Sequence, residues 1–529
     1  MRVAHTVRRY DILAMVSKMI EQEITLSEIL TAREERVSIQ NALLAEYHTP
    51  VVSFTMNIAG PVKVTALSHR AFLWGMEQLR LGFLQNKMKV LKEFSRSLPT
   101  GDEGYFAVDA PAEAVKALCV EIEEANSMGR LFDMDLIGLD GKKLERGTER
   151  PCIVCGKPGR DCASRRLHSV AELQLHTAAL LRSGLWFAAQ NRITVLATRA
   201  LLDEVAVTPK PGLVDRANNG AHRDMDLFSF QASAAALENY WGVCVGIGQF
   251  DRDIVPNTLQ RPVPSSETFA KLRPLGKQAE RDMLAATGGV NTHKGAIFTL
   301  GVLCGAIGRL WTAEEGFPTP EAILDEAAAM TRETLEQELP AARWNTAGEA
   351  LYQKYGVRGI RGQVADGLPA VREIGLPVFQ KLLADGLDRN HAAAVTLLHL
   401  IAHVEDTNLL HRGGPEGAAW AKAAVGALLE RPPEAEPFEP CRRDEPCSSG
   451  IRNECDLPQA NPDDGSAAKD RPAGDCLLRK PDKQGLSLHK IPSLEEIAEL
   501  DRLFIERNLS PGGCADLLAV TLFLESLSS

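Results

Sequence analysis

Two aspartates at residues 129–137 have a spacing suited to holding a metal ion. Asp133 and Asp135 lie two residues apart in a segment whose alternating pattern predicts a β-strand, so both carboxylates project from one face. Gly129 lets a phosphate approach the backbone, and Arg130 can offset its charge. Such a carboxylate pair can hold Mg²⁺, which completes its shell with water and phosphate oxygens in phosphoryl or nucleotidyl transfer. The alternative is a solvated strand end without a metal.

A second group of potential ligands follows in the same part of the chain. Cys152, Cys155, Cys162 and His168 supply three thiols and one imidazole, a donor set typical of a tetrahedral structural zinc site. The same loop carries four basic side chains. It is therefore equally compatible with a loop that faces phosphate or a carrier protein and whose thiols are simply buried.

The loop at residues 208–226 combines turn-forming residues with a high density of charge. Loops of this composition usually serve a site. Its carboxylates could act as a general base or as metal ligands, and its cations could hold phosphates. The alternative is an exposed turn whose carboxylates only cap helices. The candidates are the acids Asp215, Asp224 and Asp226 and the cations Lys210 and Arg216.

A glycine-rich segment at residues 288–295 precedes an apolar helical pattern. Backbone amides at that helix start and the ammonium group of Lys294 can converge on a triphosphate, with His293 beside them. Further along the chain, Arg358 and Arg361 offer guanidiniums suited to bidentate phosphate contacts. The alternatives are a plain glycine-rich helix start and an exposed basic loop.

A helix predicted over residues 391–410 carries polar groups on one face. His399, His403 and Asp406 fall at positions i, i+4 and i+7, which superficially resembles a metal site. We interpret the two histidines as ordinary helix residues. Asp406 stays a catalytic candidate, because acidic, amide and basic groups follow one another where this helix ends at glycines.

Two kinds of pattern surround these candidates. Before about residue 168, predicted strands alternate with helical patterns, one of them at 72–91, as in a mixed α/β region. A capping-box sequence at Ser169 then opens a long series of Ala- and Leu-rich helical patterns, which indicates an all-α region. Residues 432–485 have almost no apolar periodicity and are predicted to be a disordered insertion.

Length and composition limit the classes of protein. A chain of 529 residues favours two or more domains. A net charge of -11 and an aromatic content of 5% argue against nucleic acid as a partner. No apolar run approaches the roughly 20 residues that cross a bilayer, so we expect no membrane association and a cytoplasmic location. In that reducing compartment, the eleven cysteines are not expected to form disulfides.

The first region resembles a known enzyme family in several separated motifs. Residues 53–63, 129–135, 152–156 and 165–168 are similar to the apo-citrate lyase phosphoribosyl-dephospho-CoA transferase family, over about residues 26–175. The resemblance implies an α/β nucleotidyltransferase-like domain. In it, a serine hydroxyl of the acyl carrier (gamma) subunit of citrate lyase would attack the α-phosphate of a triphosphoribosyl precursor and release pyrophosphate.

The second region resembles the triphosphoribosyl-dephospho-CoA synthase family. Four distant motifs carry the resemblance, at residues 208–226, 289–295, 405–414 and 508–516. It implies an all-α domain that joins ATP to 3'-dephospho-CoA, forming 2'-(5''-triphosphoribosyl)-3'-dephospho-CoA and adenine. This chemistry needs a base, an anionic environment for an oxocarbenium-like centre, and cations for the triphosphate. The acids are Asp215, Asp224, Asp226 and Asp406, and the cations are Lys210, Lys294 and Arg361.

Together, these observations predict an α+β multidomain enzyme that makes and attaches the citrate lyase prosthetic group. It would use Mg²⁺, and zinc is one of the two interpretations of the cysteine loop. Three alternatives stay open: only one half is active, the carrier belongs to malonate decarboxylase, or the chain is a non-catalytic zinc-containing carrier-binding scaffold. The predicted parts are an N-terminal extension at 1–25, a transferase domain at 26–175, a synthase domain at 176–431 and 486–529, and the insertion at 432–485.

Overall fold

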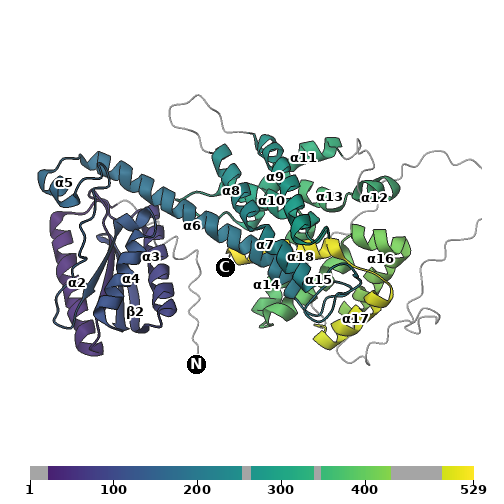
Figure 1. Ribbon diagram of the computed structural model, residues 1–529, viewed down its shortest axis with the longest axis horizontal. Helices are drawn as coiled ribbons and strands as arrows, with labels where there is room; N and C mark the ends of the chain where they lie inside the picture. The colour runs from purple at the N-terminus through teal and green to yellow at the C-terminus, as the bar shows by residue number, and fades with distance from the viewer. Residues whose placement is uncertain (1–21, 253–263, 339–346, 431–490, 529) are drawn as a thin grey trace, which may run out of the picture. The chain divides into compact units, whose positions relative to one another are not determined.

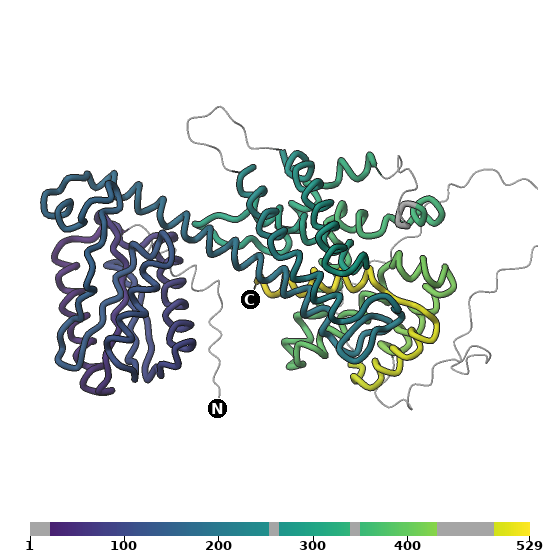
Figure 2. Tube along the Cα trace, viewed as in Figure 1, coloured from purple at the N-terminus to yellow at the C-terminus, as the bar shows by residue number. Residues whose placement is uncertain are grey.

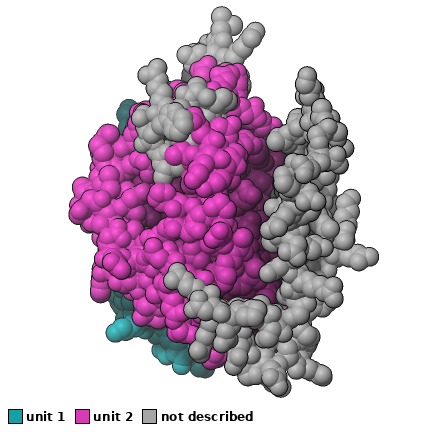
Figure 3. Space-filling view, turned by 90° about the vertical axis from the view of Figure 1, so that its right-hand side faces the viewer, with its two compact units in different colours: residues 1–195, 248–253, 307–318 teal, residues 196–247, 254–306, 319–529 magenta. Residues whose placement is uncertain are grey.

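The computed structural model describes residues 22–252, 264–338, 347–430 and 491–528. The predicted insertion and most of the predicted N-terminal extension lie outside these residues. The chain divides into two compact units, which Figure 3 distinguishes by colour. Unit 1 comprises residues 1–195, 248–253 and 307–318, and unit 2 comprises residues 196–247, 254–306 and 319–529.

A four-stranded antiparallel sheet forms the centre of unit 1 (Figure 1). β1 pairs with both β3 and β4, and the register places Ser53 opposite Asp135 and Thr55 opposite Asp133. The strands are β1 (Val51–Met56), β2 (Lys89–Leu98), β3 (Gly101–Asp109) and β4 (Phe132–Ile137), in the spatial order β2-β3-β1-β4.

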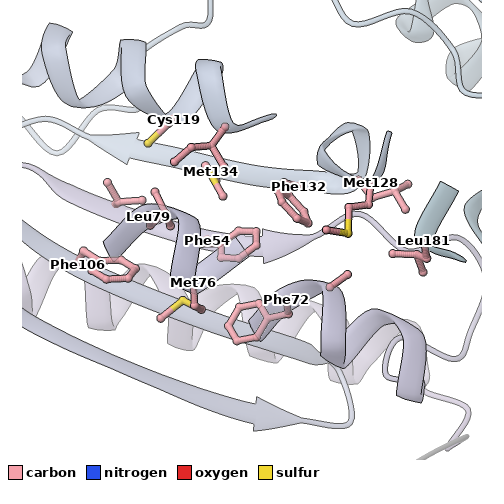
Figure 4. Packing of buried hydrophobic residues seen from close by; sticks show 14 of the residues in the cluster. Phe54, Phe72, Met76, Leu79, Phe106, Cys119, Met128, Phe132, Met134 and Leu181 are labelled. Atoms are coloured by element: carbon pink, nitrogen blue, oxygen red, sulfur yellow. The ribbon is translucent and has the colours of Figure 1, made fainter. Parts of the chain in front are cut away.

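Helices cover both faces of this sheet (Figure 1). α3 (Ala66–Gln85) and α4 (Ala112–Glu124) pack on one face over an aromatic core, while α2 (Leu26–Tyr47) packs on the other. In the core, the ring of Phe54 stacks on Phe72 at 4.9 Å and meets Phe132 edge-on at 5.2 Å (Figure 4). Offset and edge-on aromatic pairs add to the free energy of burial.

The alternation of β4 decides where the two aspartates point. Phe132, Met134 and Leu136 are buried in the aromatic core. Because successive side chains of a strand face opposite ways, Asp133 and Asp135 project from the other face. A short 3₁₀ helix, Met128–Leu131, leads into the strand.

Two helices follow β4 along the chain. α5 (Gly159–Arg165) is short, and α6 (Val170–Ala206) is the longest helix among the described residues. The predicted capping box at the start of α6 is present, because the backbone N–H and hydroxyl of Ser169 both donate to Glu172 at 2.8 Å.

The described part of unit 2 is built of helices (Figure 2). α15 and α18 are buried along most of their length and form the apolar centre of unit 2, as expected of helices that are apolar on all sides. The helices after α6 are α7 (Leu227–Ala236), α8 (Glu238–Arg252), α9 (Ser265–Ala286), α10 (Lys294–Leu310), α11 (Pro320–Glu338), α12 (Ala347–Tyr355), α13 (Gly359–Ala365), the π-helix Val371–Gly375, α14 (Leu376–Ala384), α15 (Arg389–His403), α16 (Thr407–Leu429), α17 (Leu494–Glu506) and α18 (Gly512–Ser528). The last turns of α8 and α10 belong to unit 1.

The structure corrects two predicted helices. The pattern at 72–91 covers the end of α3 and the start of β2, separated at Lys87, whose φ of 55° is incompatible with a continuing helix. The predicted helix at 391–410 is two helices. Val404 is extended and Asp406 caps α16, so Asp406 does not share a helix face with His399 and His403.

The protein is therefore mostly helical with one small antiparallel sheet, which confirms helices and strands in the first unit and an all-helical second region. The nucleotidyltransferase-like topology stays a prediction. Within the described residues, no helix is both long enough and apolar enough to span a membrane.

Candidate functional site

Unit 2 contains a cavity of about 670 Å³ where segments far apart in the sequence meet. Its walls come from the end of α6 and the following loop, the starts of α10 and α18, α13, and the junction of α15 and α16. Ionisable groups of both signs line it: Glu204, Lys210, His222, Asp224, Glu280, His293, Lys294, Arg358, Arg361, Glu405, Asp406, Arg412 and Asp516.

A glycine allows two of these helix starts to approach. A Cβ atom placed on Gly295, in the first turn of α10, would lie 1.9 Å from Oδ2 of Asp516, the fifth residue of α18. Asp516 also accepts a backbone hydrogen bond from Ala296. The glycine in the motif at 288–295 thus brings the start of α10 against a carboxylate.

Asp215 organises the loop that follows α6. Its oxygens accept from the backbone N–H groups of Lys210 at 3.1 Å, Ala217 at 2.7 Å and Asn218 at 3.0 Å. Asp501 of α17 holds the same loop by accepting from the N–H of Gly212 at 2.8 Å. Asp215 is buried and does not line the cavity, so its contacts are those of a residue that shapes the loop.

Lys210 lies at the cavity wall with its charge already paired. Its Nζ contacts Oε1 of Glu204 at 2.5 Å and the carbonyl oxygen of Glu204 at 2.8 Å. Both side chains are buried, and burial raises the pKa of Glu204 even though Lys210 lowers it. The ammonium group is thus engaged by the protein itself.

His293 presents an unused ring nitrogen to the cavity. Nδ1 lies 2.6 Å from the hydroxyl of Ser233, and the ring meets Phe230 edge-on at 5.0 Å. Nε2 is buried and has no hydrogen-bond partner among the residues that the structure describes. Burial, with the nearby charge of Lys210, lowers the pKa of His293 to about 3, so the imidazole is neutral near pH 7.

Two buried carboxyl groups lie near the start of α18. Asp406 caps α16 by accepting from the N–H of Asn408 at 2.7 Å, and its other oxygen accepts from the N–H of Cys514 at 2.8 Å. Burial raises its pKa despite these bonds. Burial, together with the charges of Glu204 and Asp406, raises the pKa of Asp516 well above its usual range. Both carboxyl groups at this wall therefore bind a proton more tightly than exposed aspartates do.

Cationic groups lie elsewhere around the cavity. Arg412 donates to the carbonyl oxygen of Ala221 at 2.8 Å and lies 3.1 Å from Nδ1 of His222. Burial and the charge of Arg412 lower the pKa of His222 to about 4. Lys294 pairs with Glu280 at 3.1 Å in a half-exposed site, where such a pair is weak and a bound anion can displace it.

The structure brings together seven of the predicted synthase residues and leaves three outside the cavity. Asp226 caps α7 through Ser229 at 2.8 Å, and the exposed Arg216 contacts Thr208 and Asn390. Asp215 is the third. Lining the cavity are Lys210, Asp224, His293, Lys294, Arg358, Arg361 and Asp406.

Sequence reasoning missed several groups at the same cavity. Glu204 and Glu280 lie inside helical patterns that carry no local signal of a site. Arg412 and Asp516 lie in motifs that the sequence did single out, at 405–414 and 508–516, and the structure shows that both line the cavity.

In unit 1, the predicted carboxylate pair lies beside basic groups. Asp133 and Asp135 are half-buried, and Asp135 forms an ion pair with Lys143. Burial, followed by the charge of Asp133, raises the pKa of Asp135. The two carboxylates lie on one face of the strand, and each disfavours the charge of the other. A divalent cation such as Mg²⁺ fits such a pair, because it offsets both charges.

A cluster of arginines adjoins this strand. Arg150 donates to the carbonyl oxygen of Phe132 at 2.5 Å and pairs with the buried Glu123, which also contacts Arg146. Arg130 donates to the carbonyl oxygen of Pro151. Burial and the charges of Arg150 and Arg146 lower the pKa of Arg130, so an anion here would relieve repulsion.

The predicted zinc ligands are also gathered in unit 1. One ligand atom from each of Cys152, Cys155, Cys162 and His168 lies within 4.8 Å of every other. The Sγ atoms of Cys155 and Cys162 are 3.4 Å apart, and Nε2 of His168 is 3.3 Å from Sγ of Cys155.

Comparison with known proteins defines the class. Residues 24–183 match the family model described as apo-citrate lyase phosphoribosyl-dephospho-CoA transferase. Residues 190–445 and 480–529 match the model described as ATP:dephospho-CoA triphosphoribosyl transferase. The protein is therefore a transferase with both domains in one chain.

Curated relatives carry the same arrangement. Protein CitXG of Haemophilus influenzae is 31% identical over 95% of this chain and 96% of its own length. Protein CitXG of Leuconostoc mesenteroides subsp. cremoris is 28% identical over 96% and 98%. A probable 2-(5''-triphosphoribosyl)-3'-dephosphocoenzyme-A synthase of Citrobacter koseri is 38% identical over 63% of this chain and 90% of its own. The chain belongs to the family of fused CitX and CitG proteins, bifunctional transferases that synthesise and attach the citrate lyase prosthetic group.

Proposed function

We propose that the unit 2 cavity joins ATP to 3'-dephospho-CoA and that the β4 face of unit 1 transfers the product to a serine of the citrate lyase acyl carrier subunit. The observation that carries the first assignment is the cavity itself. Four synthase motifs, separated by up to about 300 residues, converge there with acidic and basic groups on its walls.

In the synthase reaction, the 2'-hydroxyl of dephospho-CoA attacks C1' of the ATP ribose. The C1'–N9 bond breaks, its electron pair leaves with adenine, and the hydroxyl proton passes to a carboxylate, for which Asp224 is our candidate at the wall near Arg412. Adenine leaves more easily when protonated. Asp516, whose pKa is raised well above its usual range, is our candidate acid. The carboxyl groups of Asp406 and Glu204 are our candidates for stabilising the oxocarbenium-like centre.

The triphosphate needs cations and backbone donors. We assign this role to Lys294, Arg358 and Arg361, at the N-terminal ends of α10 and α13. Lys294 and Arg358 are half-exposed and hold only exposed or half-exposed carboxylates, Glu280 and Asp366, which a triphosphate can replace. Nε2 of His293, the unpartnered nitrogen at the cavity wall, is our candidate for a hydrogen bond to the nucleotide.

In the transferase reaction, the serine Oγ of the carrier attacks the α-phosphate of the precursor. The bond to the pyrophosphate oxygen breaks and pyrophosphate leaves. Asp133 and Asp135 would hold Mg²⁺, which neutralises phosphate charge in such reactions. Arg130, with the arginines beside it, would hold the phosphates, and this arrangement supports a nucleotidyltransferase-like role for unit 1.

The proposal includes a domain division and a location. We propose a transferase domain at residues 26–175 and a synthase domain at 176–431 and 486–529, acting in the cytoplasm. The family match leaves residues 446–479 unmatched, which supports an insertion within the proposed range of 432–485.

Mass spectrometry of the purified apo carrier subunit tests the proposal. After incubation with the protein, ATP, dephospho-CoA and Mg²⁺, we expect the mass of the carrier to rise by one phosphoribosyl-dephospho-CoA group. Asp133→Ala and Lys294→Ala should abolish the increase, while their matched controls, Asp109→Ala and Lys381→Ala at exposed positions, should retain it.

Supplying the preformed precursor separates the two halves. Lys294→Ala should then modify the carrier normally, and Asp133→Ala should not. If the wild-type protein leaves the citrate lyase carrier unmodified even with the precursor, the transferase assignment is wrong. Modification of a malonate decarboxylase carrier instead would replace the proposed partner.

A further inference from the structure

The segment after β4 gathers four potential metal ligands within a short stretch of chain. Three elements supply them: a tight turn carries Cys152 and Cys155, α5 carries Cys162, and His168 immediately precedes the cap of α6. Packing alone does not explain the set. Cys155 is exposed and His168 is half-buried, so no apolar core requires them there.

Backbone hydrogen bonds close the turn at Cys152, the first of the four ligands. The N–H of Gly156 donates to the carbonyl oxygen of Cys152 at 3.0 Å, and the N–H of Cys152 donates to Lys157 at 2.6 Å. Gly156 has φ of +72°, a conformation that glycine adopts readily. The N–H of Val154 lies 3.5 Å from Sγ of Cys152, so a backbone donor faces a sulfur that a metal would keep as thiolate.

The second half of the segment returns its ligands to the same point. Arg166 caps the C-terminal end of α5 with a left-handed backbone conformation. The N–H of Leu167 donates back to the carbonyl oxygen of Cys162 at 3.1 Å. This reversal turns the chain so that Nε2 of His168 lies 3.3 Å from Sγ of Cys155.

The spacing fits a tetrahedral ion. With Zn–S bonds of about 2.3 Å and Zn–N bonds of about 2.0–2.1 Å, ligand atoms around zinc lie roughly 3.5–3.8 Å from one another. The measured 3.4 Å between Cys155 and Cys162 and 3.3 Å between His168 and Cys155 are close to this, and all four atoms lie within 4.8 Å. A disulfide needs about 2.05 Å between sulfurs, which the described cysteines do not show.

We propose that Cys152, Cys155, Cys162 and His168 bind one zinc ion with a structural role. Four protein ligands leave no open position for water or substrate, as in structural rather than catalytic zinc sites. The site does not depend on the proposed transfer reaction, because the ligands and their spacing stand without it.

The ion would fix a loop that contacts β4. Arg150 and Pro151 directly precede the first ligand; Arg150 donates to Phe132, and Pro151 accepts from Arg130. On the other side, His168 adjoins Ser169, the cap of α6. Zinc would thus join the start of α6 to the arginine cluster beside Asp133 and Asp135.

Metal analysis of the full-length protein, purified under reducing conditions with any affinity tag removed, tests the site. We expect about one zinc per chain in the wild-type protein. Cys155→Ser and Cys162→Ser should lose most of it, Cys155→His should retain it, and Cys119→Ala, at a buried cysteine of unit 1 outside the cluster, should also retain it. Adenine release from ATP and dephospho-CoA checks that unit 2 of each variant remains folded, and the circular dichroism spectrum of each variant checks the whole chain.

Cobalt substitution reads out the ligands directly. Co²⁺ added to the zinc-depleted protein should give the visible absorption of a tetrahedral thiolate site in the wild type and in Cys119→Ala, and not in Cys162→Ser. Three outcomes would overturn the proposal: no zinc and no cobalt uptake by reduced wild-type protein, unchanged zinc in both serine variants, or a disulfide between two of these cysteines in the freshly purified protein.

Limited trypsin digestion tests the structural role. Removing zinc with a chelator should speed cleavage between residues 142 and 166 in the wild type, and Cys162→Ser should be cut at that higher rate with or without chelator. Equal rates in all samples would mean that the ion does not hold this segment.

Discussion

The two candidate sites differ in how the chain builds them. In unit 1, the carboxylates, the arginines and the proposed zinc ligands all lie between residues 123 and 168, most of them on one strand and the loop after it. In unit 2, the cavity collects groups from residue 204 to residue 516, on at least five helices. A local site keeps its chemistry in one stretch of sequence, whereas a dispersed site depends on the packing of a whole helical unit.

The difference extends to electrostatics. Asp133 and Asp135 are half-buried, and Lys143 beside Asp135 favours its charged form against the effect of burial. Burial raises the pKa values of Asp406 and Asp516, so these carboxyl groups bind a proton more tightly than exposed aspartates do. The first environment suits phosphate and metal chemistry, and the second suits proton transfer at a sugar.

The largest expected effect tests the acidic wall of the dispersed site. Asp516→Ala should lower the rate of adenine release about a thousandfold, because it removes the candidate acid. Carrier modification from preformed precursor should be unchanged. Adenine release and carrier mass are measured on the same sample, with the exposed Asp325→Ala as control. A loss of both activities would mean that the two sites are not separable in this way.

Next in size is the buried ion pair at the cavity wall. Lys210→Met should lower the free energy of unfolding by about 3–5 kcal/mol, since it leaves Glu204 buried and unpaired. The double variant Glu204→Leu/Lys210→Met should recover most of that loss. Denaturant unfolding monitored in unit 2 measures both. Lys381→Met, at an exposed ion pair, should lower the free energy of unfolding by at most about 1 kcal/mol. An equal loss for Lys210→Met would show that the buried pair matters no more than the exposed one.

The local site provides the converse experiment. Asp133→Asn should slow transfer from preformed precursor about a hundredfold and leave adenine release unchanged, because a neutral amide binds Mg²⁺ poorly. Excess Mg²⁺ should restore part of the rate. Asp109→Asn, at the exposed end of β3, is the matched control. If Mg²⁺ concentration has no effect on either protein, Asp133 does not act through a metal.

The smallest expected effect concerns pH. Burial, followed by the charge of His403, lowers the pKa of His399 to about 4 from 6.5, and neither ring nitrogen has a partner among the described residues. Between pH 6.5 and 4, His399 binds a proton in the unfolded chain and not in the folded chain. The free energy of unfolding therefore falls as the pH falls, by about 1.4 kcal/mol per pH unit at most. His399→Leu should remove this contribution to the pH dependence of the free energy of unfolding.

The measurement is the free energy of unfolding of unit 2 at pH 7 and pH 5.5. We expect His399→Leu to lose roughly 1 kcal/mol less than the wild type over this interval. The exposed His411→Gln should behave as the wild type does. Identical losses in all three proteins would show that His399 has the same pKa in the folded and unfolded states.

The sequence predicted the local site more completely than the dispersed one. The spacing of Asp133 and Asp135 specifies a shared strand face without any tertiary information, and β4 confirms it. The capping box at Ser169 was equally readable, because both partners lie within one turn. Local geometry sufficed in both cases.

Long-range packing explains what was missed. Nothing near Glu204 or Glu280 in the sequence indicates that α6 and α9 turn these carboxylates to a cavity. The helix predicted across residue 404 failed because helical periodicity continues through the break, while the hydrogen bond from Cys514 to Asp406 that accompanies it comes from 108 residues away. Asp226 is a catalytic candidate in the sequence, with helix capping as the alternative. The structure shows the cap, a role that has a local sequence signal.

The close approach at Gly295 restricts how this enzyme could be adapted to other nucleotides. Because the missing side chain of Gly295 and the carboxyl group of Asp516 occupy adjoining space, neither position can be enlarged alone. A library aimed at a different donor should therefore keep this pair fixed and diversify other lining positions, such as Phe230 and Phe298. Variants recovered with a larger residue at 295 should carry a compensating change at 516.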